Sequence, residues 1–156
     1  MAEYKIKYVR EKLSDNPPVQ VKTPQDALAY LTEKCFDKDE LWREKIFAVY
    51  MDNQKNICGH LLIGVGGVNE VTVDKHLVFK GAFDTMASAI ILAHNHPSGN
   101  CMPSQHDIKE TDQIRKACSI LGFSLLDHII LGEGKYFSFV NEKMNEFPKK
   151  TSHHKA

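Results

Sequence analysis

The side chains best suited to bind a metal ion are concentrated in one polar stretch, residues 94–107. It reads His-Asn-His-Pro-Ser-Gly-Asn-Cys-Met-Pro-Ser-Gln-His-Asp and follows directly on the apolar run 90–93. Because side chains alternate along a strand, His94 and His96 would project to the same side at the end of that strand. Both imidazoles would then reach a single ion.

A carboxylate is available as the third ligand. Two prolines and a glycine turn the chain between the strand and a helix that begins near Ser104, and this turn returns Asp107 toward the histidines. Two imidazoles and one carboxylate leave a fourth tetrahedral position for water, which is the arrangement of catalytic zinc sites. The spacing therefore predicts one Zn²⁺ per chain, bound by His94, His96 and Asp107.

Each half of this pattern also has a purely structural interpretation. Two histidines in an H-x-H arrangement on a strand are often held by ordinary hydrogen bonds. Ser104 and Asp107 fit the aspartate form of a helix capping box. The combined spacing of all four residues is far more specific than either half alone.

Other nearby side chains rank lower as ligands. Cys101 could compete for zinc, but a residue of a flexible loop is the simpler interpretation. His106 adjoins Asp107 on the expected helix and should be exposed. His128, within an apolar run, is expected to be a hydrogen-bonded core histidine, with a bond to the back of the metal site as the alternative.

The elements that position these residues alternate between helix and strand. A helix should begin after Thr23, where an N-cap residue, a proline and an acid follow one another. Short β-rich apolar runs predict buried strands, and Gly-Glu-Gly after residue 131 indicates a hairpin. The expected helices are 24–36, 73–89 and 104–122, and the expected strands are 46–51, 57–64, 90–93, 125–131 and 136–140.

Length and composition fit a single domain. The 156 residues are enough for one core, and 42% apolar with 26% charged residues is typical of globular proteins, which argues against disorder. We expect a domain over residues 20–142. An N-terminal arm, residues 1–19, would precede it and could carry an edge strand, and a flexible polar tail, residues 143–156, would follow.

The net charge and the N-terminal sequence limit the binding partners and the cell compartment that we expect for this protein. A formal net charge of +0 gives no general attraction to nucleic acid, so strong nucleic-acid binding is not expected. No apolar stretch approaches the ~18 residues that a membrane span requires. The charged N-terminus does not resemble a secretory leader, and the four cysteines include no C-x-x-C pair, so we expect a cytoplasmic protein without a membrane partner.

The complete pattern of H-x-H, seven residues, Ser, two residues and Asp resembles the metal-binding signature of the JAMM (MPN-type) zinc metalloproteases. The sequence His-Asn-His-Pro-Ser-Gly, with Leu-Asp-His-Ile-Ile at 126–130 and Ser138 downstream, is similar more narrowly to the RadC-like JAB branch. The resemblance covers residues 20–142. It implies a cytidine-deaminase-like α/β fold with a mixed sheet flanked by helices, one zinc ion, and hydrolysis of peptide or isopeptide bonds in a peptide or protein-conjugate substrate.

The resemblance also assigns the catalytic groups. The family has a glutamate at the start of its first core strand, where Glu44 stands here, as general acid/base for the attacking water and the leaving amine. From the residues alone, Glu40, Glu44 and Glu70 rank equally as solvated charges. Ser104 would hydrogen-bond the oxyanion or the catalytic water, and it could cap the helix at the same time.

Other functions compete with this interpretation. Zinc deaminases share the implied fold but use H-x-E followed by P-C-x-x-C, whereas His96 occupies the glutamate position here. The alternative is a DNA-associated metal-dependent hydrolase or nuclease linked to repair, supported by the RadC association alone. Longer RadC proteins also carry an N-terminal helix-hairpin-helix module for DNA, which we do not find here. The intact ligand set argues against an inactive scaffold.

Overall fold

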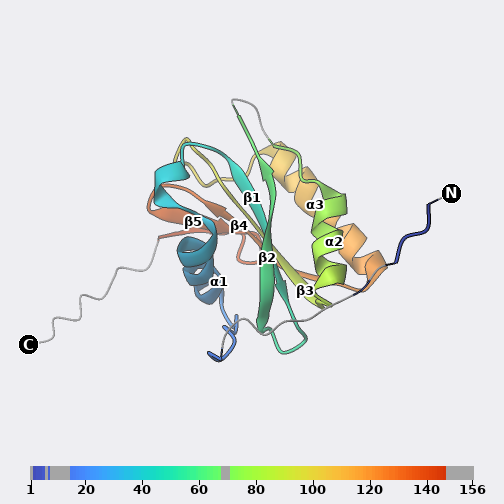
Figure 1. Ribbon diagram of the computed structural model, residues 1–156. Helices are drawn as coiled ribbons and strands as arrows, with labels where there is room; N and C mark the ends of the chain where they lie inside the picture. The colour runs from blue at the N-terminus through green and yellow to red at the C-terminus, as the bar shows by residue number, and fades with distance from the viewer. Residues whose placement is uncertain (1, 6, 8–14, 68–70, 147–156) are drawn as a thin grey trace, which may run out of the picture.

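The computed structural model describes residues 2–5, 7, 15–67 and 71–146. These residues form a six-stranded sheet with helices on both faces (Figure 1). Only one neighbouring pair, β3 with β4, is parallel, so the sheet is mixed. In spatial order its strands are β2 (Ile57–Val65), β1 (Lys45–Met51), β3 (Ala89–Asn95), β4 (Ser124–Leu131), β5 (Lys135–Ser138) and β6 (Lys143–Glu146).

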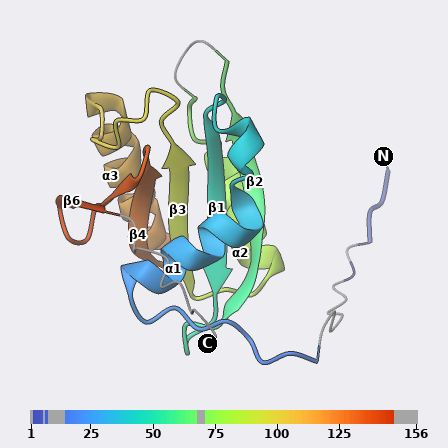
Figure 2. The ribbon, with the colours of Figure 1, turned by 90° about the vertical axis from the view of Figure 1, so that its left-hand side faces the viewer.

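Helices cover both faces of the sheet, which confirms the expected α/β architecture. Helix α1 (Pro24–Tyr30) lies across one face and continues into a π-helical turn, Leu31–Cys35 (Figure 2). Helices α2 (Lys75–Asp84) and α3 (Gln105–Leu121) lie on the opposite face (Figure 1). A short 3₁₀ turn, Lys38–Glu40, precedes β1. The central strands are therefore buried on both faces.

Two apolar clusters fill the space between these layers. Alternate residues of β3, such as Ile91 and Ala93, join the cluster under α1, whereas Ile90 and Leu92 join the cluster under α2 and α3. His94 continues the second row by the same alternation. The unbroken apolar runs in the sequence follow from this two-sided burial.

Strand pairing explains why residues distant in sequence meet at one edge of the sheet. Because β1 and β3 are antiparallel, the start of β1 lies beside the end of β3, and Ile46 pairs with His94. On the other side of β3, His94 pairs with Ile130 of the parallel strand β4. The connection between these parallel strands is α3, so its first turn lies near the end of β3.

Several expected boundaries were wrong. The helix expected over 73–89 is shorter, because Ala89 already pairs with Met51 in the sheet and Met86 adopts a positive φ of 53°. Residues 143–146, expected to belong to the flexible tail, instead form β6, which pairs with β5. Residues 147–156 lie outside the described residues, as do 8–14 of the expected arm, and the described residues before Gln20 form no strand.

No helix in the described ranges is long and apolar enough to cross a bilayer.

A tight contact holds α2 against β1. The hydroxyl of Tyr50, which is 1% exposed, donates a hydrogen bond to the carbonyl of Val78 at 2.8 Å. A Cβ atom added at Gly81 would lie 2.2 Å from the Tyr50 Oη atom. The helix can therefore approach the strand only where a glycine stands.

We predict that Gly81→Ala destabilises the fold by about 1–3 kcal/mol, because the added methyl group overlaps a buried ring. Thermal unfolding should show a fall in Tm of about 2–4 °C for each kcal/mol. Gly59→Ala is the matched control, since a Cβ there meets nothing within 4 Å among the described residues. Equal losses in the two variants would show that the contact with Tyr50 is unimportant.

Candidate metal centre

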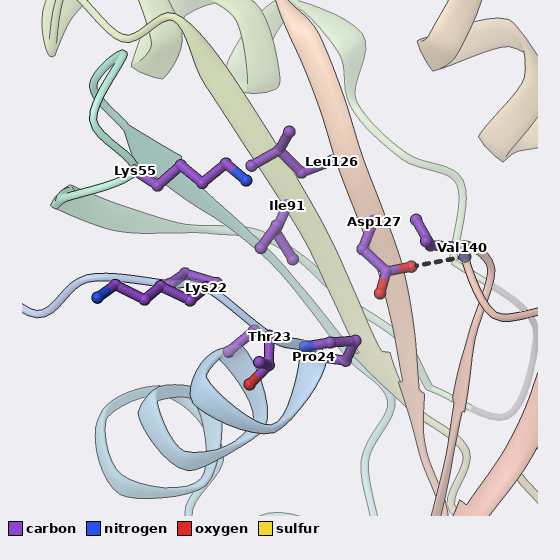
Figure 3. Close-up of a pocket in the computed structure, with 10 residues that line it drawn as sticks. Lys22, Thr23, Pro24, Lys55, Ile91, Leu126, Asp127 and Val140 are labelled. Carbon is purple, nitrogen blue, oxygen red and sulfur yellow. Dashed lines mark hydrogen bonds between the residues drawn. The ribbon is translucent and has the colours of Figure 1, made fainter.

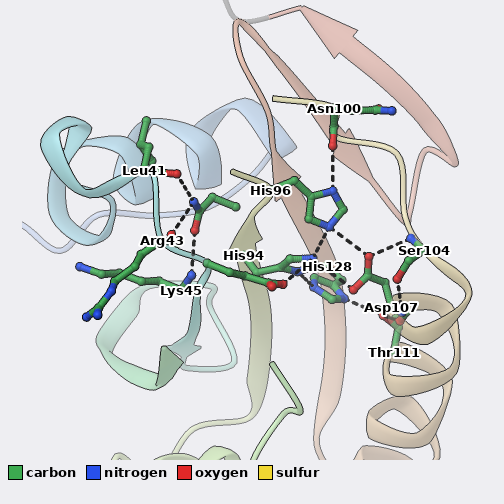
Figure 4. Close-up of polar contacts among 12 residues, drawn as sticks. Leu41, Arg43, Lys45, His94, His96, Asn100, Ser104, Asp107, Thr111 and His128 are labelled. Carbon is green, nitrogen blue, oxygen red and sulfur yellow. Dashed lines mark hydrogen bonds and ion pairs between the residues drawn. The ribbon is translucent and has the colours of Figure 1, made fainter. Parts of the chain in front are cut away.

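Four side chains that can ligate a metal meet at the edge of the sheet where β1 begins and β3 ends. They are Glu44, His94, His96 and Asp107, and their ligand atoms all lie within 4.8 Å of one another. Figure 4 shows the two histidines and the aspartate facing one another beside the first turn of α3. In the part of the chain that the structure describes, this is the one group of its kind.

The ligand atoms of three of the four residues are spaced close to the distances that a zinc site requires. The Nε2 atoms of His94 and His96 are 3.0 Å apart, and they lie 3.3 and 3.1 Å from the two carboxylate oxygens of Asp107. Zinc bonds of ~2.0–2.2 Å give tetrahedral edges of roughly 3.3–3.5 Å. The Oε1 atom of Glu44 stays farther away, 4.0 Å from His94 Nε2. The geometry thus separates a tight trio from a neighbouring carboxylate.

A backbone carbonyl fixes the tautomer of His96. The Nδ1 atom lies 2.8 Å from the carbonyl oxygen of Asn100. Because a carbonyl only accepts, Nδ1 carries a proton, and in the neutral ring the lone pair of Nε2 faces the centre. Burial, the largest single influence, lowers the pKa of His96, but a hydrogen bond from the protonated ring to Asp107, the bond to the Asn100 carbonyl and the charges of Asp107 and Glu44 together raise it above its ordinary value. The centre therefore attracts positive charge.

A longer chain of hydrogen bonds fixes His94. The Thr111 hydroxyl donates to the carbonyl of Asp107 at 2.7 Å, so its oxygen is left to accept from His128 Nδ1 at 2.6 Å. With its one proton on Nδ1, neutral His128 presents the lone pair of Nε2 to His94 Nδ1, 2.7 Å away. His94 therefore carries its proton on Nδ1, and its Nε2 lone pair also faces the centre.

Burial keeps His128 neutral, as this chain of bonds requires. The ring is 2% exposed and stacks on Phe139, with ring centroids 5.0 Å apart. Desolvation holds the pKa of His128 well below its ordinary value, and the nearby His94 lowers it further. Of the two roles left open for this histidine, the bond to the back of the site is the one observed. Thr111 was missed, because a threonine inside a helix carries no sequence signal for such a contact.

Asp107 belongs to the helix cap as well as to the centre. Its Oδ2 atom accepts from the backbone N–H of Ser104 at 2.8 Å, and the Ser104 hydroxyl oxygen accepts from the N–H of Asp107 at 3.1 Å. The capping box is thus present beside the metal-ligand geometry, and both interpretations hold. Burial alone would raise the pKa of Asp107, but hydrogen bonds from His94 and His96, formed when their Nε2 atoms carry a proton, lower it far below its ordinary value.

The side chain of Asn95 holds the segment that carries Glu44. Its Oδ1 atom accepts from Lys45 N at 2.8 Å, and its Nδ2 atom donates to the carbonyls of Leu41 and Arg43 at 3.1 and 2.8 Å. Both neighbours of Glu44 are therefore fixed by one amide. Asn95 is 2% exposed, so these bonds form out of contact with water.

Glu44 itself is partly buried. Desolvation raises its pKa above the ordinary value, although His94, His96 and a backbone hydrogen bond from Val71 act in the opposite direction. Its backbone carbonyl accepts from Gly66 N at 2.7 Å. Of the two other glutamates considered from the sequence, Glu40 is exposed and pairs with Lys45, and Glu70 lies outside the described residues. Of the glutamates that the structure describes, only Glu44 joins the centre.

The centre opens into a cleft of about 320 Å³ whose wall includes Glu44, His96, Ser104 and Asp107. A substrate can therefore reach the carboxylate of Glu44 and the hydroxyl of Ser104. Glu44 directly precedes β1 and Ser104 directly precedes α3, which are the positions expected from the sequence.

Two residues of the same stretch differ from expectation. Cys101 is fully buried rather than part of a flexible loop, because it packs with Ile130 and Phe137. It stays outside the group of metal-ligating atoms. His106 is half-buried rather than exposed, and its Nε2 atom finds no hydrogen-bond partner among the described residues. Neither residue therefore contributes a ligand.

A separate pocket of about 180 Å³ lies between the start of α1 and the strands β3 and β4 (Figure 3). Its acid, Asp127, accepts hydrogen bonds from the N–H of His128, the Ser138 hydroxyl and the N–H of Val140. These bonds join β4 to the end of β5 and to the segment that follows it. We assign Asp127 a structural role.

Comparison with known families identifies this arrangement. A model of the RadC-like JAB domain matches residues 21–144, which is most of the chain. The chain belongs to the RadC-like JAB domain family. Three similar relatives carry the name UPF0758 protein: one from Carboxydothermus hydrogenoformans is 41% identical over 121 residues, one from Aquifex aeolicus 42% over 125, and one from Methanococcoides burtonii 36% over 132.

These matches cover 78%, 80% and 85% of this chain but only 52%, 52% and 56% of the relatives. The RadC-like JAB domain described here thus spans about half the length of the relatives it matches. The family expected from the signature is confirmed, together with a side-chain group that could hold a metal ion.

We predict that Thr111→Val weakens zinc binding, because it removes the acceptor that orients His128 and through it His94. Loss of such an outer contact lowers metal affinity by about 10- to 100-fold. Competition with a chromogenic zinc chelator measures this change. The variant should also lose about 1–3 kcal/mol of stability, since His128 Nδ1 is left unpaired in the core.

Thr85→Val is the matched control, because the Thr85 hydroxyl also donates to the carbonyl four residues before it, at 2.8 Å, but contacts no histidine. It should lose stability with unchanged zinc affinity. Unchanged zinc affinity in Thr111→Val would contradict the proposed orientation of His94.

Proposed function

We propose that this RadC-like JAB domain is a zinc-dependent hydrolase that cleaves peptide or isopeptide bonds. The observation that carries the proposal is the tight trio of ligand atoms with a fourth carboxylate, Glu44, held just outside it. A structural zinc site would use four protein ligands at equal range. Three ligands and a separate acid/base favour catalysis.

The chemistry of the donor atoms fits zinc. Neutral imidazole nitrogens and a carboxylate oxygen are common zinc ligands, and the two carboxylates of the group give a surplus of negative charge that a divalent cation offsets. His94, His96 and Asp107 would hold the ion. When bound, it would supply Lewis acidity, which polarises a carbonyl group and makes water a nucleophile near neutral pH.

Glu44 is proposed to move the proton. Its carboxylate would take a proton from the attacking water and give it to the leaving amine, so that one group serves both steps. The raised pKa makes the Glu44 carboxylate a stronger base than an ordinary glutamate and leaves a larger fraction of it protonated near neutral pH, ready to give the proton away. Asn95 would keep the carboxylate at its place during both transfers.

Ser104 is proposed to stabilise the oxyanion. Its oxygen already accepts the N–H of Asp107, which leaves its hydroxyl proton available for a developing negative charge in the cleft. Capping and catalysis therefore use different parts of the same hydroxyl group.

The cleft favours a peptide over a nucleic acid. Among the described residues, those that line it include no lysine or arginine, whereas a phosphate backbone is normally bound by such cations. The net charge of the chain is +0, which adds no attraction at longer range. DNA hydrolysis linked to repair is kept as the alternative in the experiments below.

We predict one tightly bound zinc ion per chain, and its loss in His94→Ala, His96→Ala and Asp107→Ala. Metal analysis after dialysis measures the stoichiometry. Replacing His153 and His154 with serine in every sample removes adventitious binding by the polar C-terminal sequence. The control is His76→Ala, since His76 is an exposed histidine on α2 and should have no effect. Retention of zinc by the three ligand variants would refute the site.

We predict that Glu44→Gln keeps the zinc content and the Tm of the wild type but lowers turnover by about 10² to 10⁴. The substitution preserves size and removes only the ability to exchange a proton. Turnover is measured side by side on peptide, isopeptide and duplex DNA substrates. Glu40→Gln is the control, because Glu40 is exposed on the same segment. Cleavage of DNA alone would favour the alternative function, and full activity of Glu44→Gln would remove Glu44 from the mechanism.

A comparison of two helix caps isolates the role of Ser104. Thr23 caps α1 with the same capping box that Ser104 makes on α3. Ser104→Ala and Thr23→Ala should both cost about 1 kcal/mol of stability. Only Ser104→Ala should lower turnover, by about 10² to 10³. If the two variants are equally active, Ser104 acts as a cap alone.

A further inference from the structure

An apolar pocket of about 400 Å³ adjoins the metal centre on the side of the segment before β1. Its apolar walls are formed by Phe36, Leu41, Trp42, Pro97 and Leu131. The volume lies in the range of ~300–1,000 Å³ that is usual for ligand pockets. The pocket and the cleft at the metal centre share His96 and Pro97 as lining residues, so the two cavities are direct neighbours.

Two large apolar side chains of this wall are left open to solvent. Leu41 is 39% exposed and Trp42 is 68% exposed. The guanidinium carbon of Arg43 lies 4.8 Å from the centroid of the Trp42 ring, so the indole has a defined contact. Exposed apolar groups gathered around a cavity typically mark a binding site rather than a core.

The walls of the pocket are held in position by hydrogen bonds from Asn95 and His96, residues that also lie at the metal centre. The Asn95 amide binds the carbonyls of Leu41 and Arg43, on either side of Trp42. Across the pocket, His96 N donates to the carbonyl of Leu131 at 2.9 Å.

The loop that follows His96 is packed equally closely. Glu133 N donates to the carbonyl of Gly99 at 2.9 Å, and a Cβ atom at Gly132 would lie 2.3 Å from that Gly99 oxygen. The pocket is therefore preformed and fixed in position relative to the metal ligands.

We propose that this pocket binds a bulky apolar side chain, of the size of leucine or phenylalanine, on the substrate residue next to the cleaved bond. The inference rests on the proposed function, because it takes the substrate to be a peptide. The apolar walls select against charged side chains, which would lose their hydration there. Lys38 and Glu133 also line the pocket. Their charges are opposite, so together they favour neither an acidic nor a basic substrate residue.

The chain offers a direct probe of this pocket, because Trp42 is its only tryptophan. Capped tetraglycine peptides with one phenylalanine, moved through the four positions, are titrated against zinc-loaded Glu44→Gln, which prevents turnover. The change in tryptophan fluorescence gives the dissociation constant. At one position the phenylalanine should tighten binding about 10- to 100-fold over alanine at the same position, as expected for burying a large apolar side chain.

Leu41→Ala removes one wall and should abolish most of this preference. Leu62→Ala is the matched control, since Leu62 is 42% exposed on β2 and does not line the pocket. Zinc content should be unchanged in both variants. The test overturns the proposal if phenylalanine gives no gain at any position, or if Leu41→Ala and Leu62→Ala behave alike. The proposal also fails if tryptophan fluorescence changes with protein concentration rather than with peptide concentration, because the pocket is then an interface between copies of the chain.

The outcomes separate this inference from the proposed function. Selective peptide binding without cleavage by the wild type supports the pocket and contradicts the peptidase. Cleavage that ignores the phenylalanine supports the peptidase and contradicts the pocket.

Discussion

A buried chain of hydrogen bonds sets the chemistry of this domain. It runs from the Asp107 carbonyl through Thr111 and His128 to His94, and every step has one possible direction because each group has a single proton to give. The chain joins α3, β4 and β3. The position of the helix on the sheet therefore fixes the lone pair that faces the metal centre.

The need for a hydrogen-bond partner at every buried polar group explains why the centre depends on the whole fold. Buried polar groups are costly unless each finds a partner, and here Thr111, His128 and His94 are joined to one another and to the Asp107 carbonyl. Asp107 is satisfied by the cap of α3 and by both histidines. Two carboxylates brought this close repel each other, so a bound divalent cation would stabilise the folded chain as well as enable its chemistry.

The meeting of His94, His96 and Asp107 was predictable from the sequence because it follows from strand alternation and one helical turn. The place of Glu44 beside them was not predictable from the residues alone, since Glu40 and Glu44 look alike until pairing sets β1 beside the end of β3. His128 had two possible roles, and only the packing of α3 on β4 decided between them. The strand β6 was missed because its four residues, Lys-Met-Asn-Glu, carry no apolar alternation and depend on β5 for pairing.

Strand alternation also explains the residue between the two histidines. In H-x-H the two ligands point to one side of β3, so the middle residue must point to the other, toward α1. There the Asn95 amide binds the N–H of Lys45 and the carbonyls of Leu41 and Arg43, at the point where the chain enters β1. A side chain with both a donor and an acceptor is needed to bind N–H and C=O groups together. Asparagine meets this need with a short side chain, so three consecutive residues, 94–96, supply two of the candidate ligands and hold in place both Glu44 and the wall of the apolar pocket.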